Sequence, residues 1–238
     1  MVQGNLQERN GIRSGFVSYG ANGGTVDGYL ARPSDTAAHP GVILIQEWWG
    51  IEPHIKELAE RLARQGYVVL APDLYHGQVA QEPNDAMKQM MALNKDAAVK
   101  EIGKGIDYLQ GQGNIQPQKV GVVGFCMGGL LAWKVAEMED GEVAAVAPFY
   151  AGYYQPTADD IKNVTAPALV VWGERDASTP PEQRRHITQL LQQAGKTHKT
   201  LTYPAGHAFM NDTHGAGDAQ SAQQAWGELL AWFKQYLG

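Results

Sequence analysis

The sequence predicts an α/β fold in which helices cover both faces of a mostly parallel central sheet. Short, continuously apolar runs recur along the chain with amphipathic stretches between them, as expected of parallel strands buried on both faces. The chain has 238 residues, which suits one α/β domain and would be cramped for two. We therefore predict a single domain over residues 15–238, preceded by an N-terminal extension over residues 1–14.

Five apolar runs are too continuous to be half-exposed strands, and they are the predicted core strands. They lie at residues 41–46, 67–70, 119–124, 143–146 and 168–172. Residues 15–19 and 25–31 flank the turn signal Asn22-Gly23-Gly24 and predict an antiparallel hairpin at the sheet edge. Residues 199–203 are the predicted last strand.

Apolar residues at helical spacing predict the helices that cover the sheet. These helices lie around residues 55–63, 95–110, 180–193 and 222–233. Trp232 falls on the apolar face of the last helix, which favours a core position over an interface. Residues 75–94 are less regular, and we expect a loop and a helix there, where a site would open.

Composition excludes several classes of function. The formal net charge is −6 and no lysine or arginine cluster alternates with aromatics, so nucleic acid is not an expected partner. No window approaches the roughly 18 apolar residues needed to cross a membrane, and residues 1–14 do not resemble a signal peptide. We expect a cytoplasmic protein, monomeric, with a small-molecule substrate. Cys126 is the single cysteine, so the chain can form no intrachain disulfide.

Cys126 occupies a pattern typical of a catalytic nucleophile. The segment Gly124-Phe125-Cys126-Met127-Gly128-Gly129 follows an apolar strand and precedes a helical pattern. Serine hydrolases use the same arrangement, G-x-S-x-G, because the nucleophile sits on a strained turn that needs small neighbours. A lone cysteine is more often an inert core residue, and an isolated G-x-C-x-G string is a weak signal. The residues that could serve as its partners therefore decide between the two interpretations.

A triad of this type follows the chain order nucleophile, acid, histidine. Asp176 lies just past the strand at 168–172, at the sheet end where open α/β sheets place their sites. We predict Asp176 as the acid, with Glu174 as its competitor. His207 follows the last strand through a Pro/Gly turn and is the predicted base.

The other histidines provide the alternatives. His214, close to Asp212 and Asp218, is the rival base, and these three residues could also be imagined as a metal site, although no second cluster supports one. The remaining candidates are expected on surface helices or loops, and they are His39, His54, His186 and His198.

Four motifs in this order resemble the dienelactone hydrolase family, α/β-hydrolases with a cysteine at the nucleophile position. They are Gln46-Glu47-Trp48-Trp49-Gly50, Ala71-Pro72-Asp73-Leu74-Tyr75, the segment around Cys126, and Ala205-Gly206-His207-Ala208-Phe209. The resemblance covers nearly the whole chain. It implies an α/β-hydrolase fold without a large cap domain, no metal or organic cofactor, and hydrolysis of a small ester or lactone through an acyl-enzyme.

The resemblance also assigns further roles. Glu47 stands where the family's glutamate contacts the resting nucleophile and helps to activate it. The backbone N–H of Trp48 would then join that of Met127 in an oxyanion hole. The side chains of Trp48 and Trp49 could equally be packing residues. The expected substrate contacts are Trp49, Tyr75, Phe209 and Asn211.

The sequence departs from the family where the substrate carboxylate is bound. Family members that act on dienelactone use two arginines there, and Gly77 and Asn211 stand at those positions. Each charge-assisted bond lost with an arginine is worth about 1.5–3 kcal/mol. Arg175 could substitute for one of them. We therefore do not expect dienelactone to be the native substrate.

Two classes of function remain. One is a cysteine hydrolase of small esters or lactones, and the sequence does not separate ester from thioester substrates. The other is a non-catalytic or redox-sensing protein with the same fold, in which Cys126 is oxidised reversibly. Glu47, Asp176 and His207 favour the enzyme, because a sensor needs no oriented general base.

Overall fold

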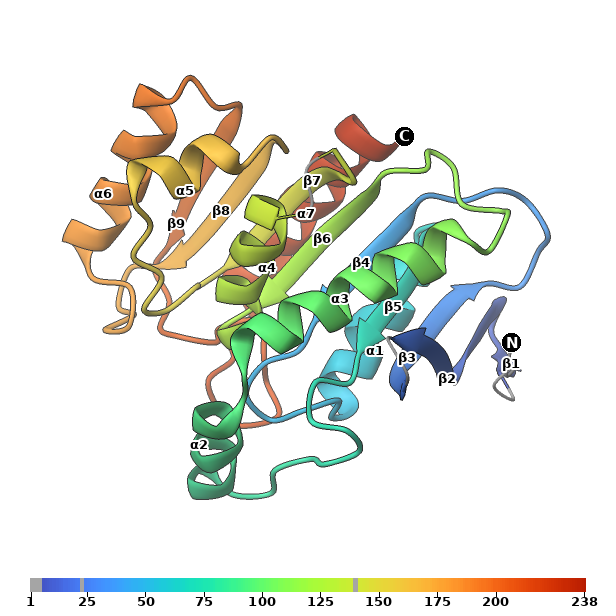
Figure 1. The fold of residues 1–238 in the computed structure, drawn as a ribbon. Coiled ribbons are helices and arrows are strands. Elements are labelled where there is room, and N and C mark those ends of the chain that lie inside the picture. Colours follow the sequence, from blue (N-terminus) through green and yellow to red (C-terminus); the bar gives the residue numbers. More distant parts are fainter. Residues whose placement is uncertain (1–5, 22–23, 139–140) are drawn as a thin grey trace. The chain divides into compact units, whose positions relative to one another are not determined.

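The computed structural model describes residues 6–21, 24–138 and 141–238, and the chain divides into two compact units, Met1–Val120 and Gly121–Gly238 (Figure 1). They are called the first and second units below. Asn22 and Gly23 of the predicted turn, and residues 1–5 of the predicted extension, lie outside the described residues. The prediction of one domain over residues 15–238 stays a prediction.

In the described part of the first unit, five strands lie side by side in the order β1-β2-β3-β5-β4. The neighbours from β1 to β5 pair antiparallel, whereas β4 and β5 are parallel. The strands are β1 (Gln7–Arg9), β2 (Ile12–Ala21), β3 (Gly24–Pro33), β4 (Gly41–Ile45) and β5 (Val68–Pro72). Every residue of β4 and β5 is buried, as their continuous apolar sequence predicts.

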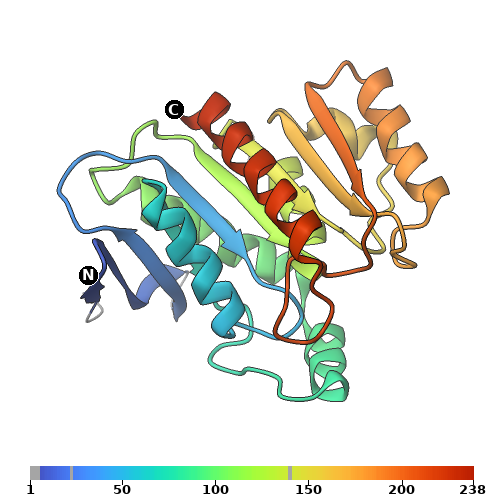
Figure 2. The same ribbon diagram turned by 180° about the vertical axis from the view of Figure 1, so that it is seen from behind.

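Helices α1 (Pro53–Arg64) and α3 (Lys95–Gln110) cover opposite faces of this sheet, as Figures 1 and 2 show together. Helix α1 packs on β3 and β5, and α3 packs on β2, β4 and β5. Helix α2 (Pro83–Ala92) lies within the irregular span, where a helix was expected. The bounds of α3 match the prediction from its apolar spacing.

Among its described residues, the second unit has four strands in the order β6-β7-β8-β9. They are β6 (Val120–Phe125), which starts at the last residue of the first unit, β7 (Val143–Phe149), β8 (Ala168–Gly173) and β9 (His198–Tyr203). Strand β8 is parallel to both β7 and β9. Helix α4 (Met127–Met138) packs on β7, and α7 (Ala219–Leu237) packs on β7 and β8 from the other side (Figure 2). Helices α5 (Ala158–Asn163) and α6 (Pro181–Gln193) complete the unit.

The predicted class is therefore confirmed as α/β, with mostly parallel strands and an antiparallel N-terminal hairpin. Trp232 is 7% exposed, so its predicted core position is confirmed. No helix in the described part of the chain is long and apolar enough to span a membrane.

Two details differ from the predictions. Residues 7–9 and 12–14, assigned to an extension, are strands, because Asn10 and Gly11 both adopt positive φ and turn β1 back onto β2. The second concerns His54, which we expected at the surface. It is 4% exposed, because it shares the sheet-facing side of α1 with Leu58.

Candidate active site

Cys126 lies on the sharp turn between β6 and α4. Its φ is +54°, in the left-handed region that non-glycine residues rarely adopt. The turn is held by backbone bonds, because the Cys126 N–H donates to the carbonyl of Phe149 at 3.1 Å and the Cys126 carbonyl accepts from Gly129 at 3.0 Å. A Cβ added at Gly124 would lie 2.0 Å from the carbonyl oxygen of Gly128, so strand and helix approach too closely for any other residue. The structure thus has the strained elbow that the glycine pattern predicts.

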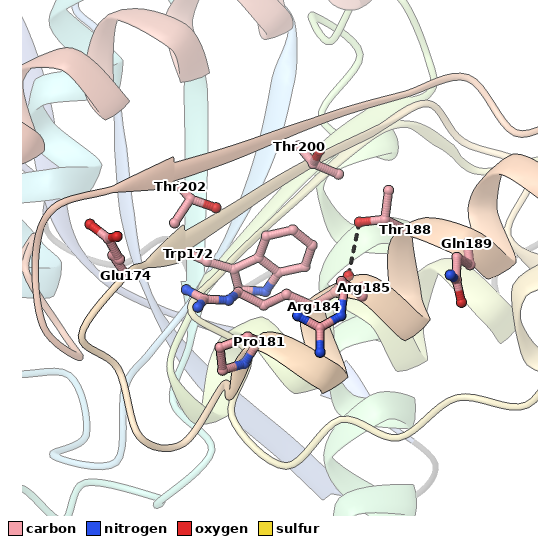
Figure 3. Close-up of a pocket in the computed structure, with 9 residues that line it drawn as sticks. All are labelled: Trp172, Glu174, Pro181, Arg184, Arg185, Thr188, Gln189, Thr200 and Thr202. Atoms are coloured by element: carbon pink, nitrogen blue, oxygen red, sulfur yellow. Dashed lines mark hydrogen bonds between the residues drawn. The ribbon is translucent and has the colours of Figure 1, made fainter.

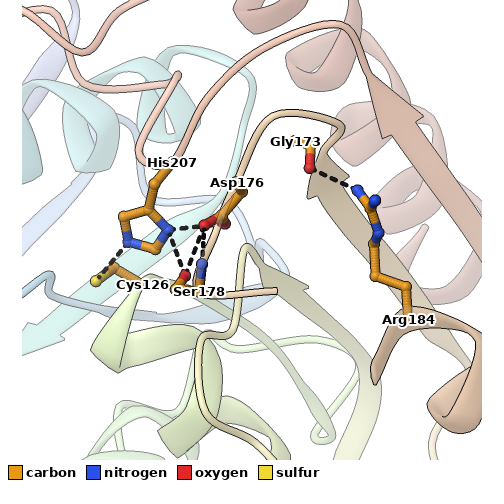
Figure 4. Close-up of polar contacts among 6 residues, drawn as sticks. All are labelled: Cys126, Gly173, Asp176, Ser178, Arg184 and His207. Carbon is orange, nitrogen blue, oxygen red and sulfur yellow. Dashed lines mark hydrogen bonds and ion pairs between the residues drawn. The ribbon is translucent and has the colours of Figure 1, made fainter. Parts of the chain in front are cut away.

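Cys126, His207 and Asp176 form a continuous line of polar contacts within the second unit (Figure 4). The Cys126 Sγ lies 3.0 Å from Nε2 of His207, and Nδ1 of His207 lies 2.8 Å from Oδ2 of Asp176. The Asp176 side chain has no exposed surface, whereas one third of the His207 side chain is exposed. A buried carboxylate favours the tautomer with the proton on Nδ1, which leaves Nε2 to face the sulfur. The structure therefore brings the three predicted residues together.

The loops that carry the acid and the histidine are held together by their backbones. The N–H of Glu174 donates to Tyr203 at 2.7 Å, and the N–H of Arg175 donates to Ala205 at 2.9 Å. A Cβ at Gly173 would lie 2.5 Å from the carbonyl oxygen of Gly206. This close approach at the ends of β8 and β9 is what brings Asp176 within reach of His207.

Ser178 is a member of the cluster that the sequence reasoning missed. Its backbone N–H and its hydroxyl both donate to Oδ1 of Asp176, at 2.8 and 2.7 Å. Its Oγ also lies 3.0 Å from Nδ1 of His207 (Figure 4). A serine two residues after an aspartate is a recognisable turn pattern, and it could have drawn attention to this position.

The electrostatics of the cluster favour a charged pair of acid and base. Burial lowers the pKa of His207, but its hydrogen bonds to Asp176 and Cys126 and their negative charges outweigh burial and raise the pKa to about 10. For Asp176, burial raises the pKa, and the opposing bonds from His207 and Ser178 bring it below the ordinary value. An imidazolium next to a carboxylate is thus the stable arrangement near neutral pH.

Aromatic side chains pack around the histidine. The Tyr150 ring lies edge-on to His207, with centroids 5.2 Å apart, and the Phe209 ring contacts Tyr150 at 5.4 Å and Tyr203 at 5.7 Å. Phe209 is fully buried in this packing, and its expected contact with substrate stays a prediction. Tyr150 did not stand out in the sequence, although it directly follows a core strand.

Three further predicted site residues, Glu47, Trp48 and Trp49, lie in the first unit. Glu47 follows β4 and is 1% exposed. Trp48 and Trp49 pack edge to face at 5.3 Å, and Trp49 also packs against Ala80 and Ala86 in a small apolar cluster. The roles assigned to Glu47, to the N–H of Trp48 and to Trp49 stay predictions.

Tyr75 and Gly77 belong to a turn that Asp73 organises. The carboxylate of Asp73 accepts from the N–H of Tyr75 at 3.1 Å and from that of Gly77 at 2.6 Å. Gly77 has φ +88°, a conformation that disfavours an arginine there. Tyr75 is 6% exposed, and its expected substrate contact stays a prediction.

Asn211 is buried in the loop that follows the histidine. Its Oδ1 accepts from the backbone N–H of Thr213 at 3.0 Å and also from the Thr213 hydroxyl. The Asn211 N–H donates to the carbonyl of Ala208. These bonds give Asn211 a role in shaping its own loop, and its expected contact with substrate stays a prediction.

The alternative base and the alternative acids lie outside the line of contacts that joins Cys126, His207 and Asp176. Asp218 caps helix α7 by accepting from the N–H of Ser221 at 2.9 Å, and His214 is exposed. Among the described residues, no group of three or more His, Cys, Asp or Glu side chains could hold a metal ion. Glu174, the competitor of Asp176, is exposed.

Glu174 also lines a hollow of about 410 Å³, and none of the three triad side chains is among its lining residues (Figure 3). The hollow lies between α6 and the strands β8 and β9, and it is lined by Trp172, Glu174, Pro181, Arg184, Arg185, Thr188, Gln189, Thr200 and Thr202. Arg184 also donates to the carbonyl of Gly173 at 2.6 Å, which ties α6 to the end of β8 (Figure 4).

The family model, the related sequences and the solved structures that match this chain agree on one protein family. The model of the dienelactone hydrolase family matches residues 26–237. "Protein usf" of Aquifex pyrophilus is 37% identical over 93% of this chain and 98% of its own length. A protein of Aquifex aeolicus named "Putative carboxymethylenebutenolidase" is 32% identical with the same coverage. A crystal structure of a "Putative Dienelactone Hydrolase" from Klebsiella pneumoniae has a TM-score of 0.86 at 28% identity, covering 95% of this chain and 100% of that one.

A match of this extent settles both the family and the general activity. The chain is a hydrolase and belongs to the dienelactone hydrolase family.

Proposed function

We propose that this hydrolase opens small esters or lactones, with Cys126 as its nucleophile and a covalent acyl-enzyme as its intermediate. The observation that carries the proposal is the contact line from Sγ through His207 to Asp176, with separations of 3.0 and 2.8 Å. It starts from a cysteine held at φ +54° on a strand-to-helix turn, and this residue is partly exposed. A nucleophile within hydrogen-bond reach of a base, which a third group orients, is the arrangement that acyl transfer requires.

In acylation, the sulfur of Cys126 attacks the carbonyl carbon of the substrate, and the thiol proton resides on Nε2 of His207. The carbonyl electrons move to the oxygen, which becomes an oxyanion. The intermediate then collapses, the bond from carbon to the leaving oxygen breaks, and His207 gives its proton to that oxygen. A thioester on Cys126 and an alcohol result, and in a lactone the alcohol stays attached to the acyl chain.

In deacylation, Nε2 of His207 takes a proton from water while the water oxygen attacks the thioester carbon. The carbon–sulfur bond breaks, the acid is released, and sulfur and imidazole share the returned proton. The carboxylate of Asp176 stabilises the imidazolium in both half-reactions, in keeping with the raised pKa of His207.

The oxyanion is proposed to accept bonds from two backbone N–H groups, those of Met127 and Trp48. Met127 is the first residue of α4, so its N–H lies at the positive end of the helix dipole. Trp48 and the activator role of Glu47 rest on the resemblance to the family. For Glu47, burial of a carboxylate at the end of β4 is in keeping with a functional role, because such burial is costly.

The decisive experiment compares hydrolysis of p-nitrophenyl acetate by the wild type and by Cys126→Ala. We expect the wild type to be faster by roughly 10³-fold or more, and rapid quenching to trap one acetyl group on Cys126 by mass spectrometry. A wild type no faster than Cys126→Ala would refute the proposal. Sensitivity to peroxide without turnover of any activated ester would instead favour the redox-sensing function.

The substrate class follows from the two positions without arginine, Gly77 and Asn211. We propose that the native substrate lacks the carboxylate of dienelactone. A panel that contains dienelactone and its neutral methyl ester tests this point, because equal kcat/KM values are expected when no cation pairs with the carboxylate. A preference of tenfold or more for the free acid would contradict this proposal and would indicate that another cation binds the carboxylate. Arg175, which directly precedes Asp176, is the candidate for that cation.

A further inference from the structure

We infer that Ser178 is a positioning residue of the active site, which fixes the carboxylate of Asp176 against His207 through its hydroxyl. The inference rests on the proposed function, because it gives Ser178 a purpose only if His207 acts on Cys126. It concerns an atom that the family motifs do not include, the Oγ of Ser178, which lies within hydrogen-bond distance of both the acid and the base.

The protons in this cluster can be assigned from the donors present. Oδ1 of Asp176 accepts two bonds, from the backbone N–H and from the hydroxyl of Ser178, at 2.8 and 2.7 Å. Because the single hydroxyl proton is used there, Oγ can only accept from Nδ1–H of His207, which it faces at 3.0 Å. The proton on Nδ1 is thus shared between Oδ2 of Asp176 and Oγ of Ser178.

Ser178 itself is held from the opposite side by the loop that follows β7. A Cβ added at Gly152 would lie 2.8 Å from Oγ and 3.1 Å from Cβ of Ser178, so this loop leaves no room for a side chain at position 152. The N–H of Tyr153 also reaches the carbonyl oxygen of Ser178 at 3.4 Å. Packing therefore restricts the rotation of the hydroxyl and keeps it between Asp176 and His207.

An ordinary aspartate turn does not explain this arrangement. Such a turn needs only the bond from the backbone N–H of residue 178 to the carboxylate, which any residue except proline can make. The hydroxyl adds a second donor to the same oxygen and an acceptor for the histidine. Its expected effect is to hold both Asp176 and the His207 ring in the orientation that proton transfer needs.

The experiment compares Ser178→Ala, which removes the hydroxyl, with Ser178→Thr, which keeps one. Thr179→Val is the matched control, because it removes a hydroxyl from the same loop, and within the described residues Thr179 Oγ1 makes no hydrogen bond. We expect Ser178→Ala to lower kcat for p-nitrophenyl acetate about tenfold with KM within about twofold, because the hydroxyl is engaged by Asp176 and His207. Ser178→Thr is expected to recover most of the loss, and Thr179→Val to remain within about twofold of the wild type.

A second measurement does not depend on turnover. The proton on Nδ1 of His207 should give a far-downfield NMR signal, which we expect to shift and to exchange faster with water in Ser178→Ala but not in Thr179→Val. An unchanged signal and an unchanged kcat in Ser178→Ala would overturn the inference, and so would a loss of kcat that Ser178→Thr does not recover. If the wild type turns over no ester, the proposed function fails, and the NMR comparison still tests Ser178. If Ser178→Ala does not fold, Ser178→Cys takes its place in both measurements, because the thiol fills the space of the hydroxyl but is a weaker donor.

Discussion

Replacing Asp176 by asparagine tests the line of contacts at its most buried point. The two carboxylate oxygens have different neighbours, because Oδ1 accepts from the N–H and hydroxyl of Ser178 and Oδ2 faces Nδ1 of His207. In the variant, the amide oxygen is expected to stay with the two donors of Ser178. The amide NH₂ would then face Nδ1 and donate to it, so that His207 takes the tautomer with its proton on Nε2.

The size of the effect follows from these contacts. Losing the charge-assisted bond to His207 costs about 1.5–3 kcal/mol, which is roughly 10- to 150-fold in rate. The wrong tautomer adds to this loss, because Nε2–H cannot accept the thiol proton across 3.0 Å. The same replacement in serine triads costs about 10⁴-fold, which sets the upper bound. We therefore expect kcat/KM to fall by between roughly 10²- and 10⁴-fold.

The assay is hydrolysis of p-nitrophenyl acetate, together with NMR titration of His207. The pKa of His207 is expected to fall from about 10 toward 6.5, because the bond to Asp176 is the largest of the influences that raise it. Glu174→Gln is the matched control, since it removes an exposed acid from the same loop, and it should stay within about twofold of the wild type. An Asp176→Asn variant within threefold of the wild type, with an unshifted His207, would refute the reasoning.

Three further predictions concern stability. In Cys126→Ala, Asp176 is expected to keep the pKa of His207 above 6.5. The free energy of unfolding should be largest below pH 6.5, over the range in which Asp176 stays ionised, and should decline as pH rises through the folded-state pKa of His207. A decline that persists after adding Asp176→Asn would contradict this. Gly124→Ala should lower the free energy of unfolding in urea by more than about 3 kcal/mol, because the added Cβ would collide with the backbone of Gly128. Gly227→Ala is its control, because the added Cβ has open space around it, and it should be neutral or stabilising by up to about 1 kcal/mol. Gly77→Arg should lower the free energy of unfolding by about 1 kcal/mol, because φ there is +88°, and Gly77→Ala should cost about the same if the backbone is the cause.

Apolar patterning was sufficient to predict most of the fold. Runs such as residues 168–172 have no polar residue to expose, so burial in a parallel sheet is the only favourable outcome, and β8 is found at Ala168–Gly173. The helix at residues 95–110 was predicted because its apolar positions repeat at helical spacing. The strand β1 was missed, since all three of its residues are exposed and carry no apolar signal. The Asn10-Gly11 pair was the available clue.

Some features of the site could also be predicted from local sequence, and others depend on tertiary structure. The elbow around Cys126 and the order of acid and histidine are local features of the sequence, because they depend on glycines next to the nucleophile and on residues that directly follow strands. The choice of Asp176 over Glu174 was made on position alone, and it is the tertiary structure that brings Asp176 to 2.8 Å from His207. The reason is the close approach of Gly173 to the carbonyl of Gly206, which no local pattern reports.

The sequence by itself therefore determined the class of fold, the strained cysteine and the family to which this hydrolase belongs. Only the tertiary structure decided which groups share a proton, because hydrogen bonds depend on separations of tenths of an ångström between residues distant in the chain. Ser178 illustrates the difference, since its hydroxyl meets a histidine 29 positions away. It lies between Asp176 and His207, and the loop that contains Gly152 packs closely against it.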